Sequence, residues 1–554
     1  MLPESSRFRI NAHQRLAPLE KRDIVNSAPT RGGDRLDVEP TLAGTPRASR
    51  AEVPPSAPAP GGNEPTGVVG TGAAGERMGF RRLAGINAFW FGGGAHWQPI
   101  SISLLPVGAI LVAGNAPELV VGRATAAGGI FAMLVPILIG YLSDRTSSRW
   151  GRRRPWMVAG TVFNVIGLGM LAIAGSPSML ILAYVFTQIA NNAAGAAYAG
   201  VIPDVVPAAE RGRASGLLGT MNQLGTVVGV GLVGVVLKQL GSNRNGLIAG
   251  YSVIAVLLVI SLVISVRAIH EEPSDFRAER AARPKRVISA TAAAAGSAFI
   301  ICLVAVLALL ILPLGSSGWI AGVVAAVAGT ALLATGLRIA ALREFFSPFR
   351  SHDFFWVFLT RFLTTLGIWS ILPFVTFYFQ DVMHASNAGA SSALWLLAVI
   401  AGAVVPSIVG GHLSDRLGRR KLFVYLSSGI QAAVASVLVI GLITSLPLMY
   451  VLGILYGIGY GMYYAVDWAL ACDVLPDRQK SAGKDMGLWH TSFTLPQALA
   501  PAVLAGVLFY FNQAGHTVLG VATGNNLGFR FVFGGAALWF ILGTVMVHRI
   551  RGVL

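Results

Sequence analysis

Beyond about residue 82, the sequence alternates between long apolar blocks and short charged segments. Each block has roughly 20 residues or more, which suffices for a helix to cross a hydrocarbon core of about 30 Å. The blocks lie near residues 87–113, 119–142, 156–175, 179–202, 214–237, 247–268, 288–313, 318–341, 353–379, 391–411, 422–443, 448–471, 487–511 and 528–548. The pattern predicts an all-α polytopic membrane protein with about fourteen transmembrane helices. One soluble domain cannot hide so many spanning-length blocks from water.

The composition indicates how these helices would pack. Only 12% of the residues are charged, about half of the share typical of soluble domains. The chain has 66 glycines, and small residues let helix backbones approach closely in lipid. Glycines that recur within two blocks are predicted to form helix contacts, at Gly225, Gly229, Gly231 and Gly234 and at Gly457, Gly459 and Gly461.

The net charge is +17, and the positions of the basic residues along the chain are informative. The excess sits at the ends of apolar blocks and not in the first 82 residues, so it indicates membrane topology and no nucleic-acid partner. One set of alternate loops carries basic clusters such as 145–154 and 416–421, whereas the opposite set has little beyond Lys238, Arg244 and Arg530. Lys and Arg accumulate in cytoplasmic loops. We therefore expect a multi-pass protein of the plasma or inner membrane with both termini in the cytoplasm.

The domain organisation follows from the blocks between charged segments. Residues 1–82 are rich in Pro, Gly, Ala and Arg without an apolar run, which predicts a disordered cytoplasmic tail without a cleavable signal. Residues 83–270 and 351–554 are each expected to form a six-helix bundle. Residues 271–350 are expected to form a cytoplasmic linker with an inserted transmembrane hairpin near 288–341. The hairpin has almost no polar residues, so we expect it to lie beside the bundles.

Two short motifs recur in the two halves at nearly one offset. Residues 140–145 (Gly-Tyr-Leu-Ser-Asp-Arg) match residues 411–416 (Gly-His-Leu-Ser-Asp-Arg), 271 residues later, and both precede an arginine cluster. Residues 204–207 match residues 473–476, which lie 269 residues later. Two independent matches predict duplicated halves of six spans each, an architecture known in transporters.

The segment 411–421, Gly-His-Leu-Ser-Asp-Arg-Leu-Gly-Arg-Arg-Lys, resembles the motif between helices 2 and 3 of major facilitator proteins, as it recurs between helices 8 and 9. The longer first copy, residues 140–155, resembles the glycoside–pentoside–hexuronide cation symporters, especially the related sucrose-transporter branch. Residues 97–106, and residues 190–192 with Asp204, resemble the first and fourth helices of that branch. The resemblance covers residues 85–550 apart from the insertion and implies the major facilitator fold. Ala199 stands where plant sucrose symporters carry an arginine, a departure that bears on disaccharide recognition and on proton coupling.

The loop motif combines a glycine, an acid and several arginines. Gly140 and Gly411 are expected to permit close helix contact. An acid serves no purpose in membrane orientation, so Asp144 and Asp415 are predicted to sit at a helix N-terminus or to pair with an arginine. The resemblance implies that this latch holds the outward-facing state and breaks when the halves rock. The arginines of the two motifs either belong to the latch or only anchor the loops in the cytoplasm. The candidates for the latch are Arg145, Arg152, Arg416 and Arg419.

Polar side chains inside spans cost free energy and indicate function. Amides donate and accept hydrogen bonds and indole rings stack on C–H surfaces, which together suit a neutral polyol such as a sugar. Hydrogen bonding between helices is the alternative role. The candidate substrate-binding residues are Trp97, Gln98, Gln188, Asn191, Asn192, Asn222, Gln223 and Trp369.

Proton coupling requires a titratable group inside the bundle. Asp467 lies near the cytoplasmic end of its span, and we expect it to pair with Arg361, about two turns in from the same side. His96 is the third candidate. The sodium-coupled relatives carry an acidic residue deep in the first or second span, and this chain has none there. The proton is therefore favoured over sodium as the coupling ion.

These features favour a secondary active transporter of a small polar organic solute, coupled to protons and embedded as a monomer in the lipid bilayer. Drug or metabolite efflux by the same fold is the alternative, although the fifth helix lacks the Gly-Pro pair usual in drug/proton antiporters. A non-transporting receptor or scaffold would not need a latch motif in both halves. No paired carboxylates, nucleophile or phosphate loop indicate an enzyme or a cofactor, and Cys302 and Cys472 are too far apart in the chain to suggest a metal site.

Overall fold

The computed structural model describes residues 78–271 and 346–551, with gaps at 147, 208–209, 418, 442, 475–481, 516, 519–520 and 523. Within these residues, twelve helices are long and apolar enough to cross a membrane. The predicted polytopic helical fold is therefore confirmed. Residues 1–77 of the expected tail and the hairpin expected near 288–341 lie outside the described residues, so the count of fourteen spans stays a prediction.

The N-terminal half begins with a span that starts earlier than its hydropathy predicts. Arg81 and Arg82 lower the local hydropathy at its first turn, but arginine is a good helix former, so the helix starts at Phe80 and not near residue 87. The spans are α1 (Phe80–Pro99), continued by the π-helical turn η1 (Ile100–Leu104) and α2 (Leu105–Ala113), then α3 (Pro117–Arg145), α4 (Arg154–Ile173), α5 (Pro177–Ala199) with the short α6 (Val201–Val205), α7 (Arg211–Leu240) and α8 (Arg244–Ala268).

The C-terminal half repeats this arrangement. After the 3₁₀ turn η3 (Ser347–Arg350), its spans are α13 (His352–Ile371), continued by the 3₁₀ turn η4 (Leu372–Phe374) and α14 (Val375–Asp381), then α15 (Ala388–Leu417), α16 (Arg420–Gly441), α17 (Leu446–Asp473), α18 (Ala482–Asn512) and α19 (Leu527–Met546), which η5 (Val547–Arg549) follows. Between α18 and α19, the two-residue strands β1 (Thr517–Val518) and β2 (Val521–Ala522) pair antiparallel, with Thr517 opposite Ala522.

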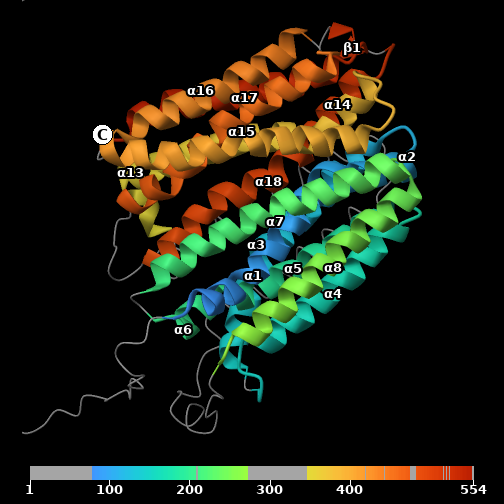
Figure 1. Ribbon diagram of the computed structural model, residues 1–554. Coiled ribbons are helices and arrows are strands. Elements are labelled where there is room, and N and C mark those ends of the chain that lie inside the picture. Colours follow the sequence, from blue (N-terminus) through green and yellow to red (C-terminus); the bar gives the residue numbers. More distant parts are fainter. Residues whose placement is uncertain are drawn as a thin grey trace, which may run out of the picture. The chain divides into compact units, whose positions relative to one another are not determined.

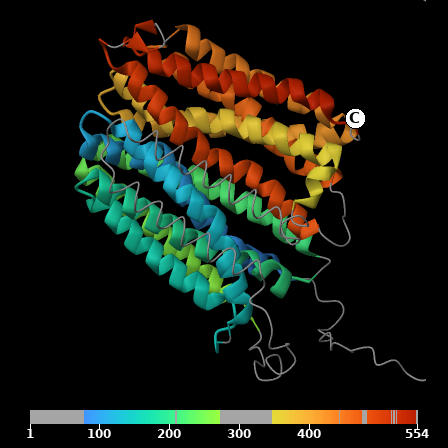
Figure 2. The same ribbon diagram turned by 180° about the vertical axis from the view of Figure 1, so that it is seen from behind.

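Within each half, the helices pack mainly against one another. In the first half α1 packs on α7 and α8, and α5 packs on α3 and α4, while in the second α15 packs on α17, and α19 on α13 and α16. Figures 1 and 2 show the blue-to-green helices of the first half beside the yellow-to-red helices of the second. The halves meet where α3 packs on α18 and α7 packs on α15. We call the side where α1 begins and α3 ends the basic side, because Arg149, Arg152 and Arg419 lie there.

Glycines bring α1 against α7 and α15 against α17. A Cβ atom added at Gly229 of α7 would overlap the backbone of Ala95 on α1, and one at Gly457 of α17 would overlap the backbone of Val399 on α15. Glycines of both runs thus form helix contacts, as expected for lipid-embedded helices whose backbones approach closely.

Gly231 makes no contact with α1, and the contact expected at Gly140 stays a prediction. No described atom lies within 4 Å of a Cβ added at Gly231 or at Gly140. Gly231 follows Gly229 by two residues, which turns it about 200° around the helix and away from α1. The sequence spacing alone could not show which of the two glycines faces the neighbouring helix.

Gly229 and Gly231 on α7 should differ in how much an alanine substitution changes the stability of the protein. We expect Gly229→Ala to destabilise the protein by about 1–3 kcal/mol, because the added methyl group overlaps the α1 backbone. Gly231→Ala is the matched control and should be neutral or stabilising by up to about 1 kcal/mol, since alanine favours helices over glycine. Thermal melting of both variants in mild detergent measures the difference. Equal melting temperatures would contradict the contact.

The first and seventh spans are interrupted at equivalent positions. The turn η1 (Ile100–Leu104) and the turn η4 (Leu372–Phe374) contact each other across the two halves. Pro106 has no N–H to give to the Ile102 carbonyl four residues earlier, and the Thr376 hydroxyl of the second half donates to that carbonyl. Matched interruptions in repeated halves are typical of transporters, and they agree with the duplication found in the sequence.

Candidate functional site

A chain of buried polar side chains connects α1, α4 and α5 in the first half. His96 Nε2 lies 3.1 Å from Asn164 Oδ1, and Asn164 Nδ2 donates to Asn191 Oδ1 over 3.1 Å. Inside a membrane, water does not satisfy such groups, so each depends on the others for its hydrogen bonds. Asn164 is absent from the residues predicted from sequence. It is, however, the one amide in the apolar block 156–175, which is a usable signal.

A second group of polar side chains lies on α5 beside this chain. Gln188 Nε2 donates to the Tyr184 hydroxyl over 3.1 Å. Asn192 Nδ2 donates to both the backbone carbonyl and the side-chain oxygen of Gln188, at 2.8 and 3.0 Å. The Trp97 ring of α1 meets Tyr184 edge-on, with ring centroids 6.5 Å apart, and also contacts the His96 ring. The predicted residues Trp97, Gln188 and Asn192 are thus brought together with His96.

The second half contains a buried ion pair. Arg361 Nε on α13 lies 3.2 Å from Asp467 Oδ2 on α17, and the two side chains are 6% and 7% exposed. The expected pairing of Arg361 with Asp467 is therefore confirmed. A buried charge in a membrane requires such a partner, because its desolvation is costly.

Aromatic rings surround the Arg361 guanidinium. Its Cζ lies 3.4 Å from the centroid of the Trp489 ring and 5.7 Å from that of Phe493 on α18. Phe493 in turn meets Trp369 of α13 edge-on, with centroids 6.5 Å apart. Guanidinium groups are attracted to the faces of aromatic rings. The arrangement places the predicted residue Trp369 in the same cluster as Arg361, with Phe493 between them.

Several polar atoms of these clusters are buried without a hydrogen-bond partner in the described part of the chain. Buried polar groups in native proteins nearly always have a partner, so these atoms are candidates to bind a solute or water. In the first half they are His96 Nδ1, Gln98 Oε1 and Ser101 Oγ, and in the second half Arg361 Nη1, Thr364 Oγ1 and Trp369 Nε1.

Two of the predicted residues lie on α7 and differ in exposure. Asn222 is half-buried, and its backbone carbonyl accepts a hydrogen bond from Thr226 at 3.0 Å. A Cβ at Gly94 of α1 would overlap that same carbonyl. Gln223 is exposed. The structure therefore sets Gln223 apart from the buried polar side chains, whereas Asn222 lies at the contact between α1 and α7.

The two halves are joined by hydrogen bonds on the side opposite the basic side. Ser103 Oγ and Ser392 Oγ lie 3.2 Å apart, next to the bond from Thr376 to Ile102. Ser242 Oγ accepts from the Gly389 backbone N–H at 3.1 Å. The Ser242–Gly389 bond lies where α7 ends and α15 begins, and the bonds at Ser103 and Ile102 lie at the interruption η1 of the first span, so together they connect the halves on this side of their interface.

The sequence matches the profile of the Major Facilitator Superfamily over residues 91–501. The chain belongs to this superfamily. It is thus a multi-pass transporter, as the resemblance of its loop motifs implies. The described spans, the repeated halves and the interrupted first and seventh helices agree with this membership.

Solved structures of other major facilitator transporters share the fold. A peptide transporter of the POT family in complex with alafosfalin superposes with a TM-score of 0.60 at 14% identity, covering 85% of this chain and 96% of that one. The POT family transporter PepTSo gives 0.56 at 16% identity over 84% and 97% of the two chains. The nucleoside transporter NupG gives 0.55 at 13% identity over 85% and 100%.

A curated relative covers only a short segment. An uncharacterized symporter of Synechocystis sp. is 48% identical over 46 residues, which are 8% of this chain and 8% of that protein. The match thus spans less than a tenth of the relative's length.

On the basic side of the transporter, arginines pair with the acids that the repeat marks. Asp204 accepts from Arg152 at 2.6 Å and from Arg153 at 2.9 Å, and Arg153 also donates to Ser143 at 2.6 Å. Burial raises the pKa of Glu271, whose carboxyl group accepts from the Arg153 backbone N–H. Arg153 is nearly fully buried, which the sequence did not predict.

The second half has the equivalent ion pair, from Arg420 to Asp473. Asp204 and Asp473 are the two acids of the second repeated motif, so the duplicated sequence corresponds to duplicated contacts. Of the predicted latch residues, Arg152 is in this network, and Arg416 and Arg419 are exposed. The surroundings of Gly411 and the side chains of Asp144, Arg145 and Asp415 lie outside the described part of the structure.

Proposed function

We propose that this transporter moves a small polar organic solute by alternating access of its two halves, with the proton as the coupling ion. The observation that carries the proposal is a buried polar cluster in each half, with atoms in both that have no hydrogen-bond partner among the residues that the structure describes. A solute that bridges the halves would complete these hydrogen bonds. Alternating access around a site between repeats is the usual mechanism of such folds.

A neutral, hydroxyl-rich solute such as a sugar fits the side chains that are available. The first half offers the amides of Gln98, Gln188 and Asn192 beside the Trp97 ring. The second half offers the Trp369 indole N–H. Amides pair with hydroxyl groups in both directions, and indole faces cover C–H surfaces. Asn191 contributes through Asn164, which fixes the His96 ring.

The Arg361–Asp467 pair is the proposed proton site. Protonation of Asp467 would remove its negative charge and release Arg361 for another partner, such as the solute. The pair is buried, and Arg361 Nη1 has no hydrogen-bond partner among the described residues, so a change in the charge of Asp467 would alter the hydrogen bonds that Arg361 can offer. The printed name of the Synechocystis relative, a symporter, agrees with coupled uptake.

We further propose that the basic side faces the cytoplasm, because Lys and Arg accumulate in cytoplasmic loops. The hydrogen bonds between Ser103 and Ser392 and between Thr376 and Ile102 would then close the outer side. In this orientation the described conformation corresponds to one closed toward the outside. The latch proposed for Asp144 and Asp415 would act on the cytoplasmic side.

Transport into proteoliposomes tests the function directly. Purified protein is reconstituted and supplied with labelled monosaccharides and disaccharides, with and without an inward proton gradient. We expect at least about tenfold accumulation of one sugar, which disappears when a proton ionophore collapses the gradient. Accumulation without any gradient dependence would contradict proton coupling. Absence of sugar transport together with proton-driven extrusion of drugs would favour efflux instead.

A further inference from the structure

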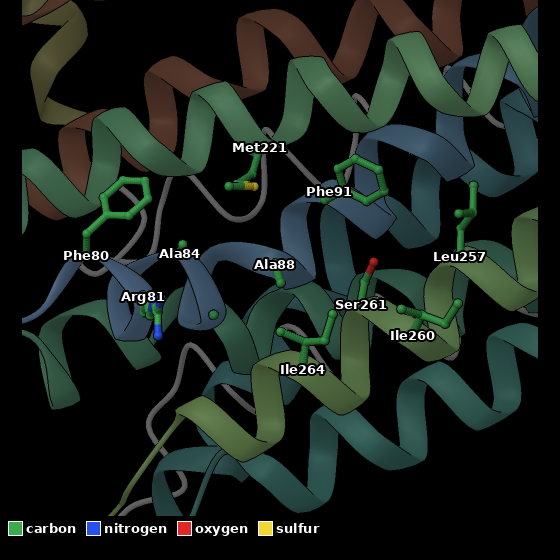
Figure 3. Close-up of a pocket in the computed structure, with 11 residues that line it drawn as sticks. Phe80, Arg81, Ala84, Ala88, Phe91, Met221, Leu257, Ile260, Ser261 and Ile264 are labelled. Carbon is green, nitrogen blue, oxygen red and sulfur yellow. The ribbon is translucent and has the colours of Figure 1, made fainter.

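A lateral groove of about 440 Å³ lies between α1, α7 and α8. Its walls are almost entirely apolar, and small side chains of α1, such as Ala84 and Ala88, leave the space open. None of its lining residues belongs to the polar clusters described above. Figure 3 shows Ile260, Ser261 and Ile264 of α8 on one side of α1 and Met221 of α7 on the other.

The length of the groove matches one leaflet of a bilayer. On α1 it runs from Phe80 to Phe91, and at about 1.5 Å per residue this distance is roughly 16 Å. Half of a hydrocarbon core is about 15 Å thick. The groove starts where α1 begins, on the basic side, and reaches Leu257 deeper in the bundle, at the opposite end in Figure 3. It therefore offers space for an acyl chain along one leaflet.

The shallow end of the groove is positively charged. Arg81 lines it and is exposed, and the next residue, Arg82, is exposed as well. Arg267 is also exposed and lies near this end. The next residue, Ala268, packs against Gly85 on the floor of the groove, because a Cβ built at Gly85 would lie 2.7 Å from the Ala268 Cβ. Glu210 is near this end of α1, where its carboxylate accepts from the Met78 backbone N–H at 3.2 Å.

We propose that this groove is a binding site for an anionic phospholipid of the leaflet on the basic side. The phosphate lies against Arg81, and one acyl chain runs along Ala84 and Ala88 of α1, in the groove that α7 and α8 flank. Basic pockets between transmembrane helices bind anionic headgroups, and the apolar walls match the chain. This site is independent of the solute site proposed above, because it shares no residue with it.

Native mass spectrometry of the full-length protein with added phosphatidylglycerol or phosphatidylcholine tests the site. The wild type should retain phosphatidylglycerol in preference. Arg81→Ala should lower that preference about fivefold, which is the effect of one cation near an anionic headgroup. Ala88→Leu fills the groove and should abolish retention of both lipids. Ala84→Val narrows it and serves as a milder variant if Ala88→Leu melts at a lower temperature.

Matched controls carry the same changes elsewhere. Ala401→Leu adds the same bulk at an exposed position of α15, and Arg530→Ala removes an exposed arginine near the start of α19. Both should retain phosphatidylglycerol as the wild type does. Equal retention of the two lipids by the wild type, or unchanged retention in a folded Ala88→Leu variant, would overturn the proposal. Retention that appears only after deletion of residues 288–341 would also overturn it, because that segment would then occupy the groove.

Discussion

An Asp467→Ala variant is expected to unfold with a free energy about 3–5 kcal/mol lower than the wild type, because Arg361 would keep a buried charge without its partner. The two side chains are only 6% and 7% exposed, so water cannot replace the lost carboxylate. The Trp489 ring, 3.4 Å from the guanidinium carbon, would remain, but a cation–π contact contributes only about 2 kcal/mol. Denaturant titration or thermal melting in mild detergent measures the loss.

The basic-side ion pair of the same half supplies the matched control. Arg420 and Asp473 are 23% and 35% exposed, and exposed pairs contribute about 1 kcal/mol or less. Asp473→Ala should therefore cost a fraction of what Asp467→Ala costs. Similar losses for the two variants would show that burial does not set the difference.

A double variant separates stability from transport. Replacement of Arg361 by methionine together with Asp467 by leucine removes both charges, and apolar replacements of buried ion pairs are often neutral or stabilising. We expect this variant to recover most of the lost stability and to show no proton-driven accumulation of solute. A folded double variant that still accumulates solute under a proton gradient would rule out the pair as the proton site.

Cysteines at Ser103 and Ser392 are expected to lock the two halves together and to lower transport at least about tenfold when oxidised. The hydroxyl oxygens of these two buried residues lie 3.2 Å apart, one in each half, and a disulfide joins sulfur atoms about 2.05 Å apart. Alternating access requires this contact to open once per cycle. Uptake into proteoliposomes before and after addition of a reductant measures the effect.

The lock needs a background without other thiols, in which Cys302 and Cys472 are replaced by alanine. The single variants Ser103→Cys and Ser392→Cys are the controls and should transport equally under oxidising and reducing conditions. Full transport by a protein whose mass shows the complete disulfide would contradict a gate at this contact. Transport that reductant restores would support it.

The sequence predicted the Arg361–Asp467 pair of the candidate site but not Asn164, and the positions of these residues explain the difference. Arg361 and Asp467 could be paired in advance because a charge inside a span needs an opposite charge at similar depth, and depth follows from residue number. Asn164 was missed because a lone amide in an apolar block has no partner in its own helix. Its partners, His96 and Asn191, come from two other helices.

The same limit applies to packing and to the lateral groove. Gly229 and Gly231 are equivalent in the sequence, yet only Gly229 meets the α1 backbone. The groove beside Ala84 and Ala88 depends on how far α8 and α7 stand from α1, and no motif marks it. Such features depend on the rotation of each helix about its axis.

By itself, the sequence determined the helical spans of the described chain, their order and the duplication of the two halves. Lipid allows only structures that satisfy every backbone group internally, so hydropathy along the chain is enough to specify spans. The tertiary structure decided which face of each helix meets which neighbour, and with it the His96–Asn164–Asn191 chain, the closed contact at Ser103 and the groove between α1, α7 and α8. The physical reason is that apolar side chains all around a helix are equally soluble in lipid, so only close packing between particular helices fixes their rotation.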